Sequence, residues 1–391
     1  MEITVKKSDF ILVPYIKSND LLATYQILNT VVPYVLLWFL AVKAAAISVL
    51  LLPPIMVLIT LFSVRCFSLM HDCGHYSLFH AKRVNRVVGF MLGVINAIPQ
   101  YPWSRGHAYH HKTNGDWERY RGPSALLSTE EFAKLSPFAQ KQYEFLRHPF
   151  MIFPGGFFYL AIKSRLALIV GTYGFLSHVL TCLKKDPRMD FAKIVSSHKS
   201  KSWYTAAEFW DLLFNNICVV GSWIFLGYLL GFGFFLSVYS ITLTGAAAIF
   251  ICVFFVQHNF DGSYAHKTEG WDYLQGAIAG SSYLELPTVL KWFAANIGYH
   301  NIHHLSERIP NYNLEACHNQ NRHLLTQAKR LRITDIPDCF KFILWDSASS
   351  RLVSIASFRQ TVQPIVDAEP SIPNKIKIAK AIVQNVEVLS K

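Results

Sequence analysis

The sequence predicts an all-α integral membrane protein in which two transmembrane helical hairpins, four spans in all, carry a cytosolic helical cap. Three observations lead to this fold class. Of the 391 residues, 52% are hydrophobic and only 16% are charged, a composition typical of a membrane protein with a cytosolic part. Two apolar blocks are each long enough for two spans. Outside these blocks, histidines recur at spacings of three and four residues, which predicts a histidine-ligated metal site in the cap.

The first apolar block, residues 24–70, can hold two spans of about 20 residues each. Lys43 lies near its middle, where we expect the turn of transmembrane hairpin 1. Pro53 and Pro54 fall near the start of the second span, where a missing backbone N–H costs least. The polar segment 1–23 carries three lysines and lacks the features of a cleavable signal peptide. We therefore expect this segment on the cytosolic side and expect insertion to depend on the internal spans.

Basic residues concentrate in the segment 71–208. Because lysine and arginine are in excess on the cytoplasmic side of membranes, this segment is predicted to form a cytosolic or interfacial part of the cap. Its apolar stretch 87–98 is too short to span a membrane. The stretch 151–183 is long enough but carries Lys163 and Arg165 at its middle. We predict that both stretches lie at the membrane interface, since one extra span would put later histidines on the opposite side.

The second apolar block, residues 209–257, contains Gly231 and Gly233 near its middle. It therefore predicts transmembrane hairpin 2, again with two spans. The chain then returns to the cytosolic side, where residues 258–353 are predicted to complete the helical cap. Residues 354–391 are expected to form a C-terminal tail.

Three histidine clusters are the strongest local signal, and all three fall on the predicted cytosolic side. HDCGH at 71–75, HAYHH at 107–111 and HNIHH at 300–304 place imidazoles at helical spacings that share one face. Imidazole suits iron, copper, nickel and zinc. Eight such ligands exceed what one ion takes, so a two-metal site is the economical hypothesis. The predicted ligands are His71, His75, His107, His110, His111, His300, His303 and His304.

The sequence around these clusters resembles the histidine boxes of membrane fatty acid desaturases. The likeness is closest to acyl-lipid desaturases of delta-12 (omega-6) type from cyanobacteria and plastids, and it extends from about residue 24 to about residue 353. The motifs that carry it are HDCGH, WSRGHAYHHKTN at 103–114, FVQHNF at 255–260, EGWDYLQGAIAGSSYLELPTVLKWF at 269–293, NIGYHNIHHLSERIPNYNL at 296–314 and LWDSASSRLV at 344–353.

This resemblance implies an oxygen-dependent oxidoreductase that introduces a cis double bond into a long, lipid-linked acyl chain. It implies two iron ions, O2 as co-substrate and two electrons, and it adds His258 as a ninth metal ligand. In related acyl-CoA desaturases an Asn four residues before that histidine holds a metal-bound water, whereas Phe254 stands here. Gln257 is the substitute that we consider. Asp72, Asp116 and Asp261 are predicted to orient the ligands from behind.

The electrons are expected from a separate protein, ferredoxin or alternatively a cytochrome b-type carrier. The net charge of +12 would suit such an acidic partner, and Lys112, Arg119 and Arg121 are the predicted docking surface. The charge also suits anionic membrane lipids, whereas no motif supports binding of nucleic acid. We expect a multi-pass protein with its catalytic cap in the cytosol, in the thylakoid or plasma membrane if the source is cyanobacterial.

Alternative functions stay open at this point. One is a di-iron fatty acyl hydroxylase or another oxygenase on the same scaffold. The other, from a different class, is a histidine-rich membrane metal transporter, although transporters place their ionisable ligands inside the spans. A soluble carboxylate di-iron bundle is disfavoured, because it needs the ExxH motif twice and only Glu315 and His318 form one.

Overall fold

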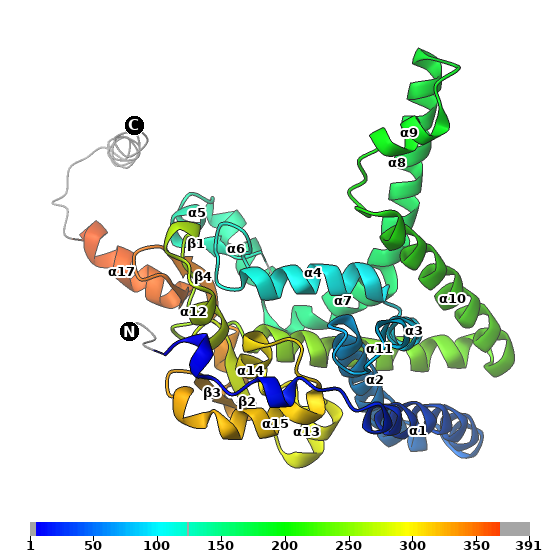
Figure 1. The fold of residues 1–391 in the computed structure, drawn as a ribbon, viewed down its shortest axis with the longest axis horizontal. Helices are drawn as coiled ribbons and strands as arrows, with labels where there is room; N and C mark the ends of the chain where they lie inside the picture. Colours follow the sequence, from blue (N-terminus) through cyan, green and yellow to red (C-terminus); the bar gives the residue numbers. More distant parts are fainter. Residues whose placement is uncertain (1–4, 123–124, 368–391) are drawn as a thin grey trace.

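The computed structural model describes residues 5–122 and 125–367. Most of these residues are helical, as predicted (Figure 1). The expected C-terminal tail begins with helix α17, Ile355–Asp367, and the rest of it lies outside the described residues. The other helices are α1 (Asp20–Ile47), α2 (Leu52–Gly74), α3 (Lys82–Ile95), α4 (Gln100–Thr113), α5 (Thr129–Ala133), α6 (Pro137–Leu146), α7 (Ile152–Phe157), α8 (Lys163–Lys185), α9 (Phe191–Ser197), α10 (Ala206–Leu230), α11 (Phe232–Val256), α12 (Tyr273–Ile278), α13 (Thr288–Phe293), α14 (His300–Leu305), α15 (Asn311–Gln320) and α16 (Ile336–Cys339).

Both predicted hairpins are present as pairs of long helices. A short turn at Val49–Leu51 joins α1 to α2, so Lys43 lies in the last helical turns of α1 rather than between the helices. The second pair, α10 and α11, is separated by Gly231, whose φ of 85° favours glycine. Helix α2 continues to Gly74 and therefore includes the first histidine of HDCGH.

Within the described residues, five helical segments are long and apolar enough to cross a membrane, judged by length and composition. Four are those of the two hairpins. The fifth, Pro149–Lys185, contains the stretch that we predicted to lie at the interface; it combines α7, a π-helical turn at Phe158–Ile162, and α8. In Figure 1 α8 projects away from the body of the protein.

Arg165 is one of the two charged residues that led us to predict no span in the stretch 151–183. Its guanidinium donates to the carbonyl oxygens of Ala97 and Leu160, at 2.7 and 2.8 Å, and to Oδ1 of Asn215 at 3.3 Å. A cation with three oxygen partners inside the protein is far less costly in an apolar segment than an unpaired one. Two of these partners, Ala97 and Asn215, lie far away in the sequence and could not be foreseen.

The all-α prediction is wrong for part of the cap, which contains two small β-sheets. In the first sheet β4 pairs in parallel with β1 and antiparallel with β5. In the second, β2 and β3 pair in parallel. The strands are β1 (Leu127–Ser128), β2 (Ser282–Glu285), β3 (Lys329–Arg332), β4 (Phe342–Asp346) and β5 (Arg351–Ser354).

The β4–β5 hairpin occupies the region predicted to be helical around LWDSASSRLV. Ile343 and Trp345 are buried, and they belong to the β-branched and aromatic residues that favour strands. Ser350 adopts φ of 54° in the turn between the strands. Trp345 stacks on Trp117 at 4.6 Å between ring centroids, which anchors the hairpin in the cap.

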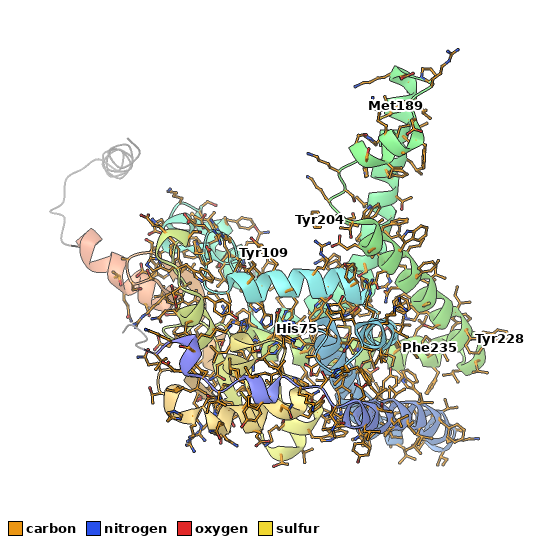
Figure 2. The ribbon with its side chains drawn as sticks, in the orientation of Figure 1. His75, Tyr109, Met189, Tyr204, Tyr228 and Phe235 are labelled. Atoms are coloured by element: carbon orange, nitrogen blue, oxygen red, sulfur yellow. The ribbon has the colours of Figure 1, made fainter. Side chains whose placement is uncertain are left out.

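The spans and the cap meet at the inner ends of α2 and α11. Figure 2 shows His75 inside this junction, whereas Tyr228 lies at the far tip of the α10–α11 hairpin. Buried Arg65 of α2 ties the two parts together: its Nε donates to Thr30 Oγ1 at 2.9 Å, and its guanidinium carbon lies 3.8 Å from the centre of the Trp292 ring. The histidine clusters thus lie where the helical hairpins meet the cap.

Candidate metal centre

The nine histidines predicted as ligands lie together at this junction, in two groups. In each group one ligand atom per residue lies within 4.8 Å of all the others. The five-histidine group consists of His71, His75, His107, His111 and His303, and the four-histidine group of His110, His258, His300 and His304.

The helical spacing divides each HxxHH cluster between the groups. On α4, His107 and His111 are four residues apart and face the five-histidine group, while His110 faces the other. On α14 the division is reversed, because His303 belongs to the five-histidine group and the outer pair, His300 and His304, to the four-histidine group. Each helix therefore lies between the two groups and contributes to both.

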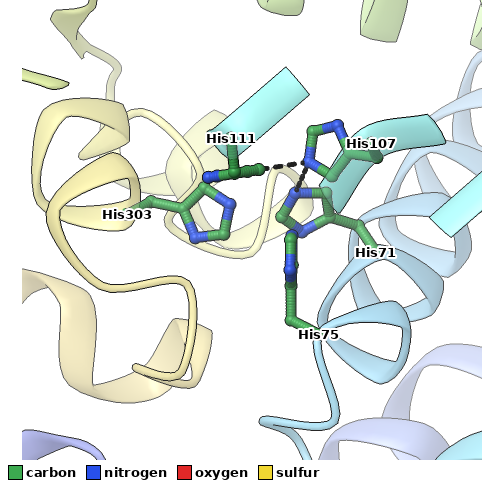
Figure 3. Close-up of side chains that lie close together, drawn as sticks. All are labelled: His71, His75, His107, His111 and His303. Carbon is green, nitrogen blue, oxygen red and sulfur yellow. Dashed lines mark hydrogen bonds between the residues drawn. The ribbon is translucent and has the colours of Figure 1, made fainter. Parts of the chain in front are cut away.

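In the five-histidine group the Nε2 atoms crowd together (Figure 3). His107 Nε2 lies 2.8 Å from His71 Nε2 and 3.0 Å from His111 Nε2. His75 Nε2 is buried and has no hydrogen-bond partner among the described residues, and the same holds for both ring nitrogens of His303. Buried nitrogen lone pairs without donors are costly, so this donor set suits a cation of the type that imidazole binds.

The four-histidine group is equally compact. His258 Nε2 lies 2.9 Å from His300 Nε2 and 3.1 Å from His110 Nε2. His304 Nε2 lies 3.2 Å from His300 Nε2. All four residues are buried, and their convergence fits a second metal ion.

Hydrogen-bond acceptors at the Nδ1 side hold three of the histidine rings in place. His258 Nδ1 lies 2.9 Å from the Gly280 carbonyl oxygen, which as an acceptor requires the proton on Nδ1 and leaves the Nε2 lone pair for a metal. His71 Nδ1 approaches Asp72 Oδ1 at 3.3 Å, and His75 Nδ1 approaches Glu307 Oε2 at 3.2 Å. Asp72 therefore takes the orienting position that we predicted.

The other two predicted carboxylates do not orient ligands. Asp116 accepts from Thr268 and pairs with Arg119, and Asp261 is exposed. Glu307 was missed, although it is the first carboxylate after HNIHH and could have been considered on that ground. The hydrogen bond from His75 lowers the pKa of Glu307, which keeps it ionised opposite the ring.

Phe254 is an apolar neighbour of both groups. Its ring centroid lies 5.6 Å from those of His71 and His300. Gln257, considered as a substitute for the family's asparagine, donates from Nε2 to the Ile297 carbonyl oxygen at 2.8 Å, and its buried Oε1 has no partner among the described residues. Gln257 is thus held against the backbone that leads into HNIHH.

Burial keeps the ligand rings neutral. Desolvation lowers the pKa of His258 to about 4, although the Gly280 carbonyl opposes the shift. Desolvation, followed by repulsion from neighbouring imidazoles, holds the pKa values of other ligands well below the ordinary range; these are His107, His110, His111, His300, His303 and His304. Neutral imidazole is the form that binds a metal.

The metal-free protein is therefore expected to lose stability as the pH falls from about 6.5 toward 4. The unfolded histidines, with pKa values near 6.5, bind protons in this window while the folded ones do not. For His258 alone the loss approaches about 3 kcal/mol. Thermal unfolding in detergent between pH 7.5 and 5 measures it, and His258→Leu should make the decline shallower. Equal unfolding temperatures across this range would contradict the prediction.

A cavity of about 600 Å³ opens beside the two histidine groups. His107, His110 and His258 lie in its wall, so it borders both groups. Its other walls come from α2, α4, α7, α8, α10 and α11 and are mostly aromatic or aliphatic, with Phe67 and Phe254 among them. An elongated apolar molecule in this cavity would lie directly against the histidine rings.

Similarity to known proteins agrees with this arrangement. The profile of the fatty acid desaturase family matches residues 47–335, more than half of the chain. A fatty acid desaturase of Bacillus subtilis (strain 168) is 30% identical over 356 residues, which cover 91% of each chain.

More distant relatives have more specific names. The sn-1 acyl-lipid omega-3 desaturase (ferredoxin) of Nostoc sp. (strain 36) is 26% identical over 251 residues, 63% of this chain and 61% of the relative. The chloroplastic omega-6 fatty acid desaturase of Arabidopsis thaliana is 24% identical over 264 residues, 64% of this chain and 49% of the relative. The match thus spans less than two thirds of either relative. The chain belongs to the fatty acid desaturase family, whose members are oxidoreductases that catalyse oxygen-dependent desaturation.

Proposed function

We propose that this protein is a di-iron desaturase that introduces a cis double bond into a long acyl chain linked to a membrane lipid. The observation that carries the proposal is the pair of histidine groups bordering one apolar cavity. The five-histidine and four-histidine groups would each hold one iron. The cytosolic cap would comprise residues 71–208 and 258–353, with the helical hairpins in the membrane.

The overall reaction removes two hydrogen atoms from adjacent methylenes and reduces O2 to two waters, using two electrons and two protons from outside. Bound iron would supply the oxidising power needed to break an unactivated C–H bond. The chain's own residues position the substrate and exclude water. Trp103 stacks on His107, with ring centroids 4.8 Å apart, and Phe254 packs against both groups, so an acyl chain would replace water beside the histidines.

Ferredoxin is the electron donor that we propose, because the Nostoc relative carries it in its name; a cytochrome b-type carrier is the alternative. The proposed substrate is an acyl chain in a glycerolipid, as the name of the same relative suggests. The resemblance in the histidine motifs implies a delta-12 double bond. Omega-6 and omega-3 desaturases both appear among the relatives, so the position of the double bond tests the subtype.

Expression in a host without polyunsaturated lipids tests the proposal. We expect a new double bond in the lipid acyl chains, at delta-12, that depends on O2 and on iron. A double bond at another position would support desaturation as the reaction but contradict the delta-12 subtype. A hydroxylated chain without new unsaturation would favour the hydroxylase, and histidine-bound zinc without any oxygen-dependent product would favour the transporter.

Filling the cavity should reduce turnover of long chains. Gly155 lies in the cavity wall, and a Cβ there would meet no atom within 4 Å. Gly155→Leu is therefore expected to fold normally and to lower desaturation of long acyl chains about tenfold, because the side chain takes space from the substrate. Product analysis with acyl chains of different length measures the effect.

Gly174→Leu is the matched control for this prediction. It makes the same substitution on the same apolar segment, Pro149–Lys185, also with no atom within 4 Å of the added Cβ, but away from the cavity wall. Equal turnover by the two variants would contradict the role of the cavity. Gly156 is unsuitable for this test, because its Cβ would come within 2.8 Å of Ala247 Cβ.

A further inference from the structure

A second cavity, of about 390 Å³, lies in the cap and shares no wall residue with the first. Asn301 forms part of its wall, is fully buried, and stands between His300 and His303 in the chain. The cavity therefore reaches the back of HNIHH, the side opposite the acyl cavity's histidines. Its walls come from β2, β3, α15 and the Arg322–Leu324 turn.

Three stacked rings line this second cavity. Tyr283 and Tyr299 are nearly parallel, with ring centroids 4.7 Å apart. His318 lies 4.8 Å from Tyr283 and 5.0 Å from Tyr299. His318 belongs to neither histidine group and packs against these two tyrosines instead.

The stack connects to the four-histidine group along two short routes. Tyr299 is joined to His300 by a peptide bond. On the other side Ser282, the neighbour of Tyr283, donates from its backbone N–H to the Gln257 carbonyl oxygen at 3.0 Å, and Gln257 directly precedes His258. Electrons move through proteins most readily along covalent bonds and short hydrogen bonds, so both routes lead from the cavity to ligands of one group.

Two arginines, Arg322 and Arg330, lie in the wall of this cavity, and β3 carries two further basic residues beside Arg330. Arg322, Lys329, Arg330 and Arg332 all have exposed side chains; together we call them the β3 surface. Arg330 pairs with Glu285 at 2.7 Å, whereas within the described residues no ion pair involves Arg322 or Lys329. In Figure 1, β2, β3 and α15 lie on the side of the protein opposite the tips of α1 and α10, where a soluble partner has access.

The docking surface predicted from the sequence is less suitable. Arg119 pairs with Asp116 at 3.3 Å and Arg121 with Glu131 at 2.8 Å, so acidic neighbours offset both charges. Tyr120, between these arginines, lies in the wall of the acyl cavity. These arginines therefore border the substrate side of the metal centre.

We propose that the β3 surface binds the acidic electron donor and that electrons reach the four-histidine group through Tyr283 and Tyr299. This inference rests on the proposed function, because only iron-dependent oxygen chemistry requires the electrons. The donor would dock twice per turnover and be oxidised by one electron each time, and the metal centre would gain the two electrons. No covalent bond of the chain forms or breaks in this step.

The variant Arg322→Glu with Lys329→Glu tests the docking surface, with a reduced 2Fe–2S ferredoxin as the probe. We expect ferredoxin binding to the full chain in detergent to weaken at least about tenfold at low salt, and the difference to disappear near 0.5 M salt, where surface charges are screened at about 4 Å. Lys112→Glu with Arg119→Glu is the matched control and should bind normally. Normal binding by the β3 variant, or weakened binding by the control alone, would overturn the proposal.

Turnover driven by dithionite and methyl viologen separates this inference from the proposed function. The β3 variant should retain this turnover and lose ferredoxin-driven turnover. A wild-type protein that makes no product with either reductant would refute the proposed function, while the binding measurement would still decide the docking surface. Product formation together with unimpaired ferredoxin coupling in the β3 variant would refute only the inference.

Replacement of a ring in the stack tests the electron route. Tyr283→Leu should leave ferredoxin binding unchanged and slow reduction of the metal centre, followed by stopped-flow absorbance. Tyr283→Phe keeps the ring and should restore the rate. An unchanged rate of reduction in Tyr283→Leu would overturn the route through this stack.

Discussion

Replacing His300 by alanine is expected to abolish desaturation and to leave one iron per chain instead of two. His300 Nε2 lies 2.9 Å from His258 Nε2 and 3.2 Å from His304 Nε2, so it joins the other members of the four-histidine group. Its loss leaves three ligands for that ion. Removing a group that only hydrogen-bonds to a metal ligand typically lowers metal affinity or activity about 10- to 100-fold. Removing the ligand itself should cost more, so we expect turnover to fall at least about 100-fold.

Iron per protein and product formation, measured on the same samples, check this prediction. His80→Ala is the control, because His80 is an exposed histidine outside both groups and should retain two irons and full turnover. His303→Ala provides a graded comparison, since the five-histidine group keeps four ligands without it. A His300→Ala protein with two irons and normal turnover would show that the four-histidine group binds no catalytic metal.

The eight histidines of the three clusters could be identified as candidate ligands because their spacing is local, whereas His258 came only from the family resemblance. Positions i, i+3 and i+4 of a helix share a face whatever the helix packs against. HAYHH and HNIHH therefore indicated a metal site from the sequence alone. Their division between two groups could not be predicted. Whether His110 or His111 faces a given ion depends on how α4 lies between α2 and α14, which is a property of packing.

The hairpins could also be predicted, because apolar length is sufficient to indicate them. The short strands and the contacts between residues distant in the sequence could not be predicted. β4 has five residues, too few for a period to distinguish a strand from a helical turn. A carbonyl oxygen that stabilises Arg165 belongs to Ala97, and the carboxylate behind His75 belongs to Glu307. Such long-range pairs exist only in the fold.

Asp72→Ala is expected to destabilise the protein by about 2 to 4 kcal/mol and to weaken metal binding. Asp72 is buried, and its Oδ2 accepts from the Asn311 backbone N–H at 2.7 Å and from Asn311 Nδ2 at 2.9 Å. Its Oδ1 faces His71 Nδ1 at 3.3 Å. One carboxylate therefore joins α2 to α15 and orients a ligand, and alanine leaves the buried donors of Asn311 without this acceptor.

Asp72→Asn separates these two roles. The amide keeps the shape and one acceptor oxygen for Asn311, so the fold should lose less stability than in Asp72→Ala. It removes the charge that favours a proton on His71 Nδ1, so the ring no longer presents its Nε2 lone pair as reliably and metal affinity should fall about 10- to 100-fold. Thermal unfolding of the metal-free variants measures the first role, and iron titration of the folded variants measures the second. If Asp72→Asn bound iron as tightly as the wild type, the carboxylate would serve only to join the helices, and the orientation of His71 would have to come from its packing against Trp103, Phe254 and His303.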